Sequence, residues 1–321
     1  AQQFDLLLKP LQFGLDELPA LISVGTRKEI AITGQGFKLR FDAKLGTLAS
    51  WHHRGVELLE AGPRFEPWRA PTDNDELSDM GRIWRKAGLH ALVHEVEGIE
   101  LQKADPGKAV VTARVVSRAV KGEAVFRQVY TYTILGSGDV LFDCSVTPEG
   151  DIPHVPKLGF AWRLPAAFDT FTWYGRGPHE TYPDRELGAM IGIYREKVRV
   201  ENMPYVMPQD YGNKTGVRWA ALTNGQGIGI AVFGRPEFQA GAHPFDTRTL
   251  EESQQTFTLE AKPYIVLHTD FAVCGLGNGS CGPGTLPKYL VHPRPAAYRL
   301  RIRPFGPGES PDHWARTTPF A

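Results

Sequence analysis

The polar side chains best suited to chemistry lie in four loops that are rich in proline and aromatic residues. The first loop, residues 64–76, is stiffened by two prolines and carries Arg69, Asp73 and Asn74 close together. Guanidinium, carboxylate and amide groups gathered in this way can hydrogen-bond a polyhydroxylated ligand. The alternative is structural, with Asp73 or Asp75 capping the helix that follows. The loop lacks the glycine and distal glutamate of an EF-hand, so it does not indicate a calcium site.

The second loop, residues 173–185, combines His179, Glu180, Asp184 and Arg185 with three aromatic rings. Aromatic rings stack on the CH face of a sugar while planar charged groups bind its hydroxyls. This composition therefore indicates carbohydrate binding. The alternative is an ion-pair cluster that only fixes the shape of a long loop.

The third loop, residues 274–284, matches the dinucleotide pattern G-x-G-x-x-G over residues 277–282. The context excludes nucleotide binding, because a Pro-Gly pair stands where a helix should begin. We expect instead a backbone that passes close to another group. Asn278, Ser280 and Cys281 are the side chains that this loop offers to a ligand.

The cysteine residues give an indication of the cellular compartment in which the protein works. The chain has three cysteines, Cys144, Cys274 and Cys281. Cys274 and Cys281 could form a disulfide, but the odd third residue favours free thiols in a reducing compartment. We therefore expect a cytoplasmic protein. No Cys-x-x-Cys or Cys/His spacing indicates zinc, so we expect no metal or cofactor in this chain.

The fourth loop, residues 202–213, is again rich in proline and aromatic residues and carries amide side chains. His243 and His268 stand alone outside the four loops. We interpret both histidines as structural residues.

The overall composition excludes several functional classes. With 34 glycines and 25 prolines in 321 residues, the chain is too rich in helix breakers for a helical bundle. Lys plus Arg and Asp plus Glu each total 36, so the formal net charge is zero. This balance argues against nucleic acid and against an anionic membrane as partners held by bulk electrostatics. The sequence also lacks an apolar run long enough to predict a transmembrane helix.

The elements that must position these loops are mostly strands. Hydrophobic residues alternate along residues 108–119, 124–135 and 139–147, which are separated by glycine turns and predict an antiparallel meander. Further strands are predicted at 30–41 (a hairpin), 45–51, 216–224, 227–233, 264–272 and 297–305. Only residues 75–88 predict a helix, with acidic residues early, basic residues late and Gly88 at the end. Strands without alternating helices favour an all-β sandwich or barrel.

The four loops, in this order, resemble the C-terminal domain of the large bacterial β-galactosidases of glycoside hydrolase family 2, whose two-chain members carry the same unit as a small chain. The matching segments are WRAPTDND (68–75), YGRGPHETYPDR (174–185), PYVMPQ (204–209) and GLGNGSCGP (275–283). The resemblance spans about residues 22–305. It implies an antiparallel super-sandwich similar in fold to galactose mutarotases.

The resemblance also implies an accessory role. Retaining hydrolysis needs two carboxyl groups about 5–5.5 Å apart, and in this family they lie on a separate TIM barrel. A barrel takes about 250 residues of alternating strands and helices, which this chain lacks. We therefore expect no catalytic residue here and an isolated chain that is inactive.

The implied partners are the N-terminal remainder of a β-galactosidase, including its barrel, and a β-galactoside. A Mg or Na ion is expected only in the full enzyme. The best-known members carry a tryptophan after the serine of the late loop, where it stacks on the sugar, whereas this chain has Cys281. The resemblance implies substrate binding by Asn278, Ser280, Cys281, Arg69, Asp73, Asn74, His179, Glu180, Asp184 and Arg185.

The chain is divided into three parts. Residues 1–21 are predicted to be an end strand of a preceding domain (Ala1–Leu8) plus a linker, 22–307 the sandwich and 308–321 a loose C-terminal tail. The missing initiator methionine favours a segment of a longer protein. Three other functions stay open: a free-standing carbohydrate-binding module, a mutarotase-like epimerase with His179–Glu180 or His268 as acid–base groups, and a structural domain for subunit contacts.

Overall fold

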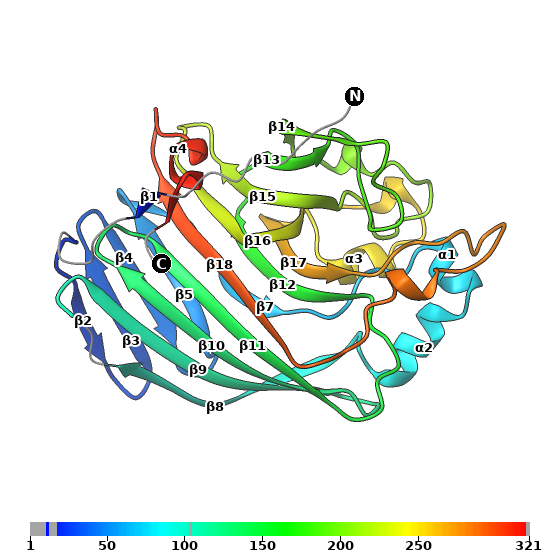
Figure 1. Ribbon diagram of the computed structural model, residues 1–321, viewed down its shortest axis with the longest axis horizontal. Coiled ribbons are helices and arrows are strands. Elements are labelled where there is room, and N and C mark those ends of the chain that lie inside the picture. Colours follow the sequence, from blue (N-terminus) through cyan, green and yellow to red (C-terminus); the bar gives the residue numbers. More distant parts are fainter. Residues whose placement is uncertain (1–10, 13–17, 103–104, 319–321) are drawn as a thin grey trace.

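Long antiparallel strands dominate the computed structural model, which describes residues 11–12, 18–102 and 105–318 (Figure 1). The larger sheet has 12 strands, nine of them in the continuous order β14-β13-β15-β16-β18-β11-β10-β9-β8. A branch of three strands joins it where β17 pairs with the second half of β16, and β12 and β7 follow. The strands of this sheet are β7 (Ala61–Phe65), β8 (Leu92–Gln102), β9 (Lys108–Ala119), β10 (Val125–Leu135), β11 (Val140–Glu149), β12 (Lys157–Pro165), β13 (Thr170–Gly177), β14 (Met190–Lys197), β15 (Lys214–Thr223), β16 (Gly229–His243), β17 (Tyr264–Val273) and β18 (Ala296–Phe305).

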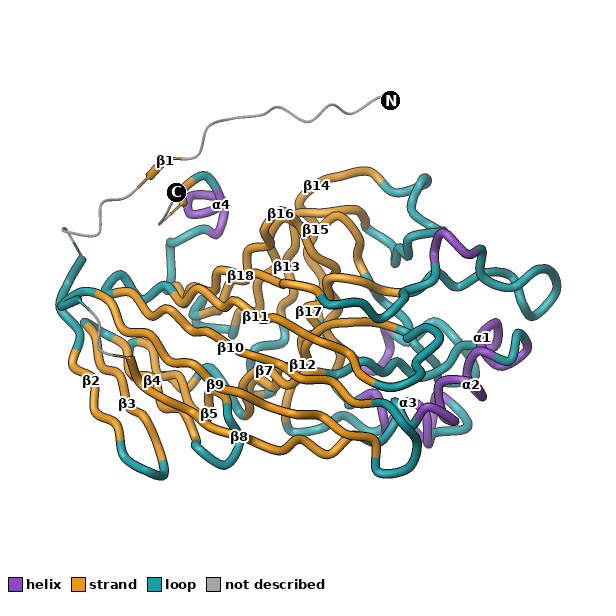
Figure 2. The backbone as a smooth tube through the Cα atoms, turned by 60° about the horizontal axis from the view of Figure 1, so that its bottom comes forward, coloured by secondary structure: helices purple, strands orange, loops and turns teal. Residues whose placement is uncertain are grey.

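A smaller sheet of five strands lies beside the β8–β11 part of the large sheet (Figure 2). Its strands are β2 (Ile22–Gly25), β3 (Glu29–Gly34), β4 (Phe37–Asp42), β5 (Thr47–His53) and β6 (Val56–Glu57). The rings of Phe41 and Tyr132 meet edge to face, with centroids 5.0 Å apart, and join the two layers. Gly46 allows a close approach here, because a Cβ atom at this position would lie 2.9 Å from Val96. A continuous apolar core therefore fills the space between the sheets.

The helices gather mainly at one end of the sandwich (Figures 1 and 2). They are α1 (Asp73–Leu77), α2 (Met80–Ala87), α3 (Thr247–Glu252) and α4 (Pro311–Ala315), with short 3₁₀ turns η2 (Val200–Asn202), η3 (Thr256–Thr258) and η4 (Pro287–Tyr289). Among the described residues, no helix is long and apolar enough to cross a membrane.

The predicted meander and the later strands are confirmed. Residues 108–119, 124–135 and 139–147 form β9, β10 and β11, with Tyr130 opposite Ala113 on one side and Cys144 on the other. The 30–41 hairpin forms β3 and β4. Several strands were not predicted, among them β8, β12 and β14. In β8 half-buried and exposed residues alternate without a fully buried one, so its hydrophobic signal is weak.

The single predicted helix over 75–88 is wrong in its extent. It forms two helices, α1 and α2, because the chain turns at Asp79, which has a left-handed φ of 64°. The N-cap of α1 is Thr72, not Asp73 or Asp75, and Asp75 completes the capping box from the third helical position. Gly88 ends α2 as predicted. Helices α3 and α4 were also not predicted.

Two predictions concern the ends of the chain. The strand predicted for Ala1–Leu8 lies outside the described residues. The tail predicted as loose is instead ordered in part, since it contains α4 and the short strand β19 (Thr317–Thr318), which pairs with β1 (Leu11–Gln12). The buried Arg301 side chain donates to the carbonyl oxygens of Trp314 at 2.9 Å and Thr317 at 2.6 Å. These bonds anchor the C-terminal segment on the sheet.

Candidate functional site

The four loops identified from the sequence meet beside α1, at the right-hand end of the molecule in Figure 1. Arg69 joins the first loop to the third. Its guanidinium is fully buried and forms a two-point pair with Asp75, with Nη2–Oδ1 at 2.7 Å and Nε–Oδ2 at 3.1 Å. It also donates to the carbonyl oxygens of Cys274 at 2.7 Å and Gly275 at 3.1 Å. Arg69 therefore fixes the base of the third loop.

The charge of Arg69 is sustained by its neighbours. Burial opposes the charged form, but Asp75 and the other neighbouring groups together outweigh it and raise the pKa of Arg69 above its usual value. A buried pair of this kind is stable only when its remaining hydrogen-bonding groups are satisfied. The two loop carbonyls and the Thr72 backbone N–H, which donates to Asp75 at 2.9 Å, meet that need.

Two further side chains hold the third loop from opposite sides. Asn74 donates to the carbonyl oxygen of Gly277 at 2.9 Å and accepts from the backbone N–H and the hydroxyl of Ser280 at 2.9 and 2.6 Å. Asp184 accepts from the backbone N–H groups of Leu276 at 3.0 Å and Gly277 at 2.7 Å. The shape of the loop is thus set by residues from the first and second loops.

The second and fourth loops are tied together in the same way. Glu180 accepts from the backbone N–H of Gly212 at 2.8 Å and from the hydroxyl of Tyr205. Gln209 accepts from the backbone N–H of Asp73 at 3.1 Å and donates to its carboxylate at 3.3 Å. All four loops therefore form one hydrogen-bonded unit.

The predicted site residues divide into two groups by exposure. Four are engaged in holding the loops: Arg69, Asn74, Glu180 and Asp184. The other six have exposed side chains that a ligand could reach: Asp73, His179, Arg185, Asn278, Ser280 and Cys281. The fixed loops therefore present polar groups and one thiol to solvent.

A polar cluster buried near the loops was missed by the sequence reasoning. Lys157 on β12 lies 2.9 Å from Nδ1 of His268, 3.3 Å from Oε2 of Glu66 and 3.5 Å from Oδ2 of Asp270. Burial raises the pKa of Asp270 to about 7, although Lys157 opposes the shift. His268 and Asp270 lie two residues apart on one face of β17, but no sequence spacing groups them with Lys157 on β12 or with Glu66 after β7.

The two histidines interpreted as structural are both buried. Their rings lie 5.5 Å apart, centroid to centroid. Burial lowers the pKa of His243 to about 3 and that of His268 well below its usual value, with Lys157 adding to both shifts. Both rings are therefore neutral near pH 7.

The described part of the chain contains no group of three or more His, Cys, Asp or Glu side chains arranged to hold a metal ion. Cys144 and Cys274 are buried free thiols, and Cys281 is an exposed one. The disulfide considered between Cys274 and Cys281 is therefore not formed.

Comparison with known sequences gives a consistent result. The profile of the β-galactosidase small chain matches residues 33–302. The β-galactosidase of Priestia megaterium is 33% identical over 279 residues, covering 85% of this chain and 26% of that protein. The β-galactosidase of Vibrio vulnificus is 26% identical over 298 residues, covering 89% of this chain and 28% of that protein. The chain thus spans about a quarter of the length of these relatives.

Comparison with solved structures also gives alignments over most of the chain. An α-mannosidase from Enterococcus faecalis aligns with a TM-score of 0.51 at 10% identity, covering 87% of this chain and 29% of that chain. A galactose 1-epimerase from Lactobacillus acidophilus aligns with a TM-score of 0.48 at 8% identity, covering 90% of this chain and 99% of that chain. The predicted fold class, an all-β antiparallel super-sandwich, is confirmed.

Proposed function

The chain belongs to the β-galactosidase small-chain family, and we propose that it completes the galactoside-binding pocket of a retaining β-galactosidase whose catalytic carboxylates lie on a TIM barrel in the remainder of the enzyme. The observation that carries the proposal is the third loop. Three side chains from other loops, Arg69, Asn74 and Asp184, hold it in one shape. A loop fixed before substrate arrives can position a sugar without a further entropic cost.

The two groups of site residues then have different roles. The exposed side chains of Asn278, Ser280 and Cys281 at the loop tip contact the galactoside. Cys281 occupies the position where the best-known members of the family carry a stacking tryptophan, so this pocket relies more on hydrogen bonds than on stacking. The four loop-holding residues act as positioning residues.

Catalysis is assigned to the remainder of the enzyme. A retaining mechanism requires a carboxyl pair about 5–5.5 Å apart on either side of the glycosidic bond, and we place that pair, with any Mg or Na ion, on the barrel-bearing part. The three free thiols support a cytoplasmic setting. The isolated chain is accordingly expected to be inactive.

Complementation tests this function. The chain is mixed with the separately produced N-terminal remainder, and hydrolysis of an aryl β-galactoside is followed. We expect activity only from the mixture, and a much lower kcat/KM when residues 278–281 are deleted. Arg114→Ala, on an exposed pair of β8 and β9, is the matched control. A remainder that is fully active alone, or a deletion without kinetic effect, would refute the proposal.

A further inference from the structure

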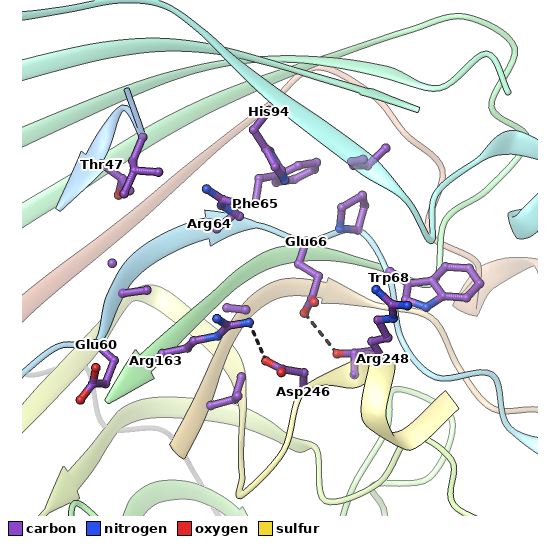
Figure 3. Close-up of a pocket in the computed structure, with 18 of the residues that line it drawn as sticks. Thr47, Glu60, Arg64, Phe65, Glu66, Trp68, His94, Arg163, Asp246 and Arg248 are labelled. Carbon is purple, nitrogen blue, oxygen red and sulfur yellow. Dashed lines mark hydrogen bonds and ion pairs between the residues drawn. The ribbon is translucent and has the colours of Figure 1, made fainter. Parts of the chain in front are cut away.

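A groove that shares only residues 64–68 with the four loops is lined by β5, β7, β8, β12 and α3 (Figure 3). Its volume is about 920 Å³, at the large end of the range of roughly 300–1,000 Å³ in which proteins hold small ligands. None of the ten predicted site residues lines it. We call it the β7 groove, and its charged lining includes Arg64, Glu66, Arg163, Asp246 and Arg248.

The lining includes a carboxylate, that of Glu66, which its neighbours hold in place. The side chain of Glu66 is 28% exposed, and its Oε2 lies 3.3 Å from the ammonium of the buried Lys157. Thr247 donates to the same oxygen at 3.4 Å. Glu66 therefore presents a fixed acceptor to the groove, while the ammonium of Lys157 that supports it is buried.

The lining also includes a guanidinium and a carboxylate in a fixed arrangement (Figure 3). Arg163 donates to Oδ1 of Asp246 at 2.9 Å, and the Tyr264 hydroxyl donates to Oδ2 at 2.7 Å. The guanidinium of Arg163 also lies 4.6 Å from the centre of the Tyr264 ring. These contacts orient both charged groups before any ligand is present.

Neutral and cationic donors complete the lining. His94 uses Nδ1 to contact the Ser117 hydroxyl at 2.7 Å. Burial, aided by the neighbouring Arg64, lowers the pKa of His94 to about 4, so its ring is neutral near pH 7. The side chains of Arg64 and Arg248 are exposed and can reach a ligand in the groove.

The distribution of charge selects the class of ligand. An anion would meet Glu66 and Asp246, and a cation would meet Arg64, Arg163 and Arg248. An uncharged ligand with many hydroxyls can donate to the carboxylates and accept from the guanidinium groups, and it meets no net repulsion. We propose that the β7 groove is a second binding site, for a neutral saccharide.

The aromatic residues of the groove limit its affinity. Phe65 and Trp68 are at most 5% exposed, so ring stacking adds little. Recognition therefore depends on hydrogen bonds that compete with water, and binding is weak and sensitive to single side chains. This inference does not rest on the proposed role of the loops.

Titration of the isotope-labelled chain with lactose, followed by NMR and calorimetry, tests the proposal. We expect saturable binding, with chemical-shift changes at groove residues, and about tenfold weaker binding for Arg64→Ala and for Arg248→Ala. Both side chains are exposed, so these variants should fold normally. Arg114→Ala, in an exposed ion pair outside the groove, should bind lactose as the unaltered chain does.

Three results would overturn the proposal. These are an absence of saturable binding up to the solubility limit of lactose, unchanged binding by both groove variants, and tighter binding of galacturonate than of lactose. The complementation experiment tests the proposed function of the third loop, and this titration tests the proposed binding site in the groove. Either proposal can therefore fail while the other holds.

Discussion

Replacing Arg69 with methionine is expected to destabilise the chain more than any surface charge change. Methionine keeps much of the side-chain volume but removes both bonds to Asp75 and both bonds to the carbonyls of Cys274 and Gly275. Both charged side chains are fully buried, so Asp75 is left as an uncompensated charge. Breaking a buried pair in this way costs about 3–5 kcal/mol. The two orphaned carbonyls place the loss toward the upper end of that range.

Urea unfolding measures this loss, since the free energy of unfolding falls linearly with denaturant. The double variant Arg69→Met/Asp75→Asn should lose less than Arg69→Met alone, because the buried charge is gone. Arg82→Ala, in an exposed pair with Asp79, is the control and should unfold as the unaltered chain does. Hydrogen exchange at Leu276 should accelerate in Arg69→Met. A loss below about 1 kcal/mol, the scale of a surface ion pair, would refute the reasoning.

Four other changes have defined outcomes. Asp270 has a pKa of about 7 in the folded chain and about 3.9 in the unfolded chain, so the free energy of unfolding falls as pH rises between these values. Asp270→Asn should remove that fall in urea unfolding, and an unchanged pH profile would contradict it. Asn74→Ala should cost about 1–2 kcal/mol and speed hydrogen exchange at Ser280. Gly277→Ala should lower kcat/KM of the reassembled enzyme, because φ is 61° and a Cβ would lie 2.5 Å from a backbone nitrogen; normal kinetics would argue against a fixed loop. Cys281→Trp should strengthen inhibition by galactose through ring stacking, and weaker inhibition would contradict the assigned position.

Local patterns in the sequence predict the strands better than they predict the helices. The β9–β11 meander follows from alternation that a single segment can show. The break between α1 and α2 depends on Asp79 adopting a left-handed backbone, which the charge pattern of residues 75–88 does not reveal. The capping role of Thr72 was missed because two acidic residues nearby are equally good caps by type.

Residue roles in the candidate site depend on contacts that span the chain. Arg69 was predicted to bind substrate, and its type is suited to that, but its partner carbonyl at Cys274 is 205 residues away. Lys157 and Asp270 meet across 113 residues because β12 pairs with β17. The loops could thus be found from composition and order, whereas the division into exposed and loop-holding residues required the tertiary structure.

The place of β18 in the large sheet has a consequence for biosynthesis. This strand lies between β11 and β16, with Ile302 opposite Val140 on one side and Val232 on the other. The β8–β11 half and the β13–β16 half therefore cannot be joined until Phe305 has left the ribosome. Until then β11 and β16 are open edges, which are prone to pairing with other chains. Translation that stops before Ala296 would release a protein with both edges unprotected. The yield of soluble protein therefore depends on the synthesis of β18.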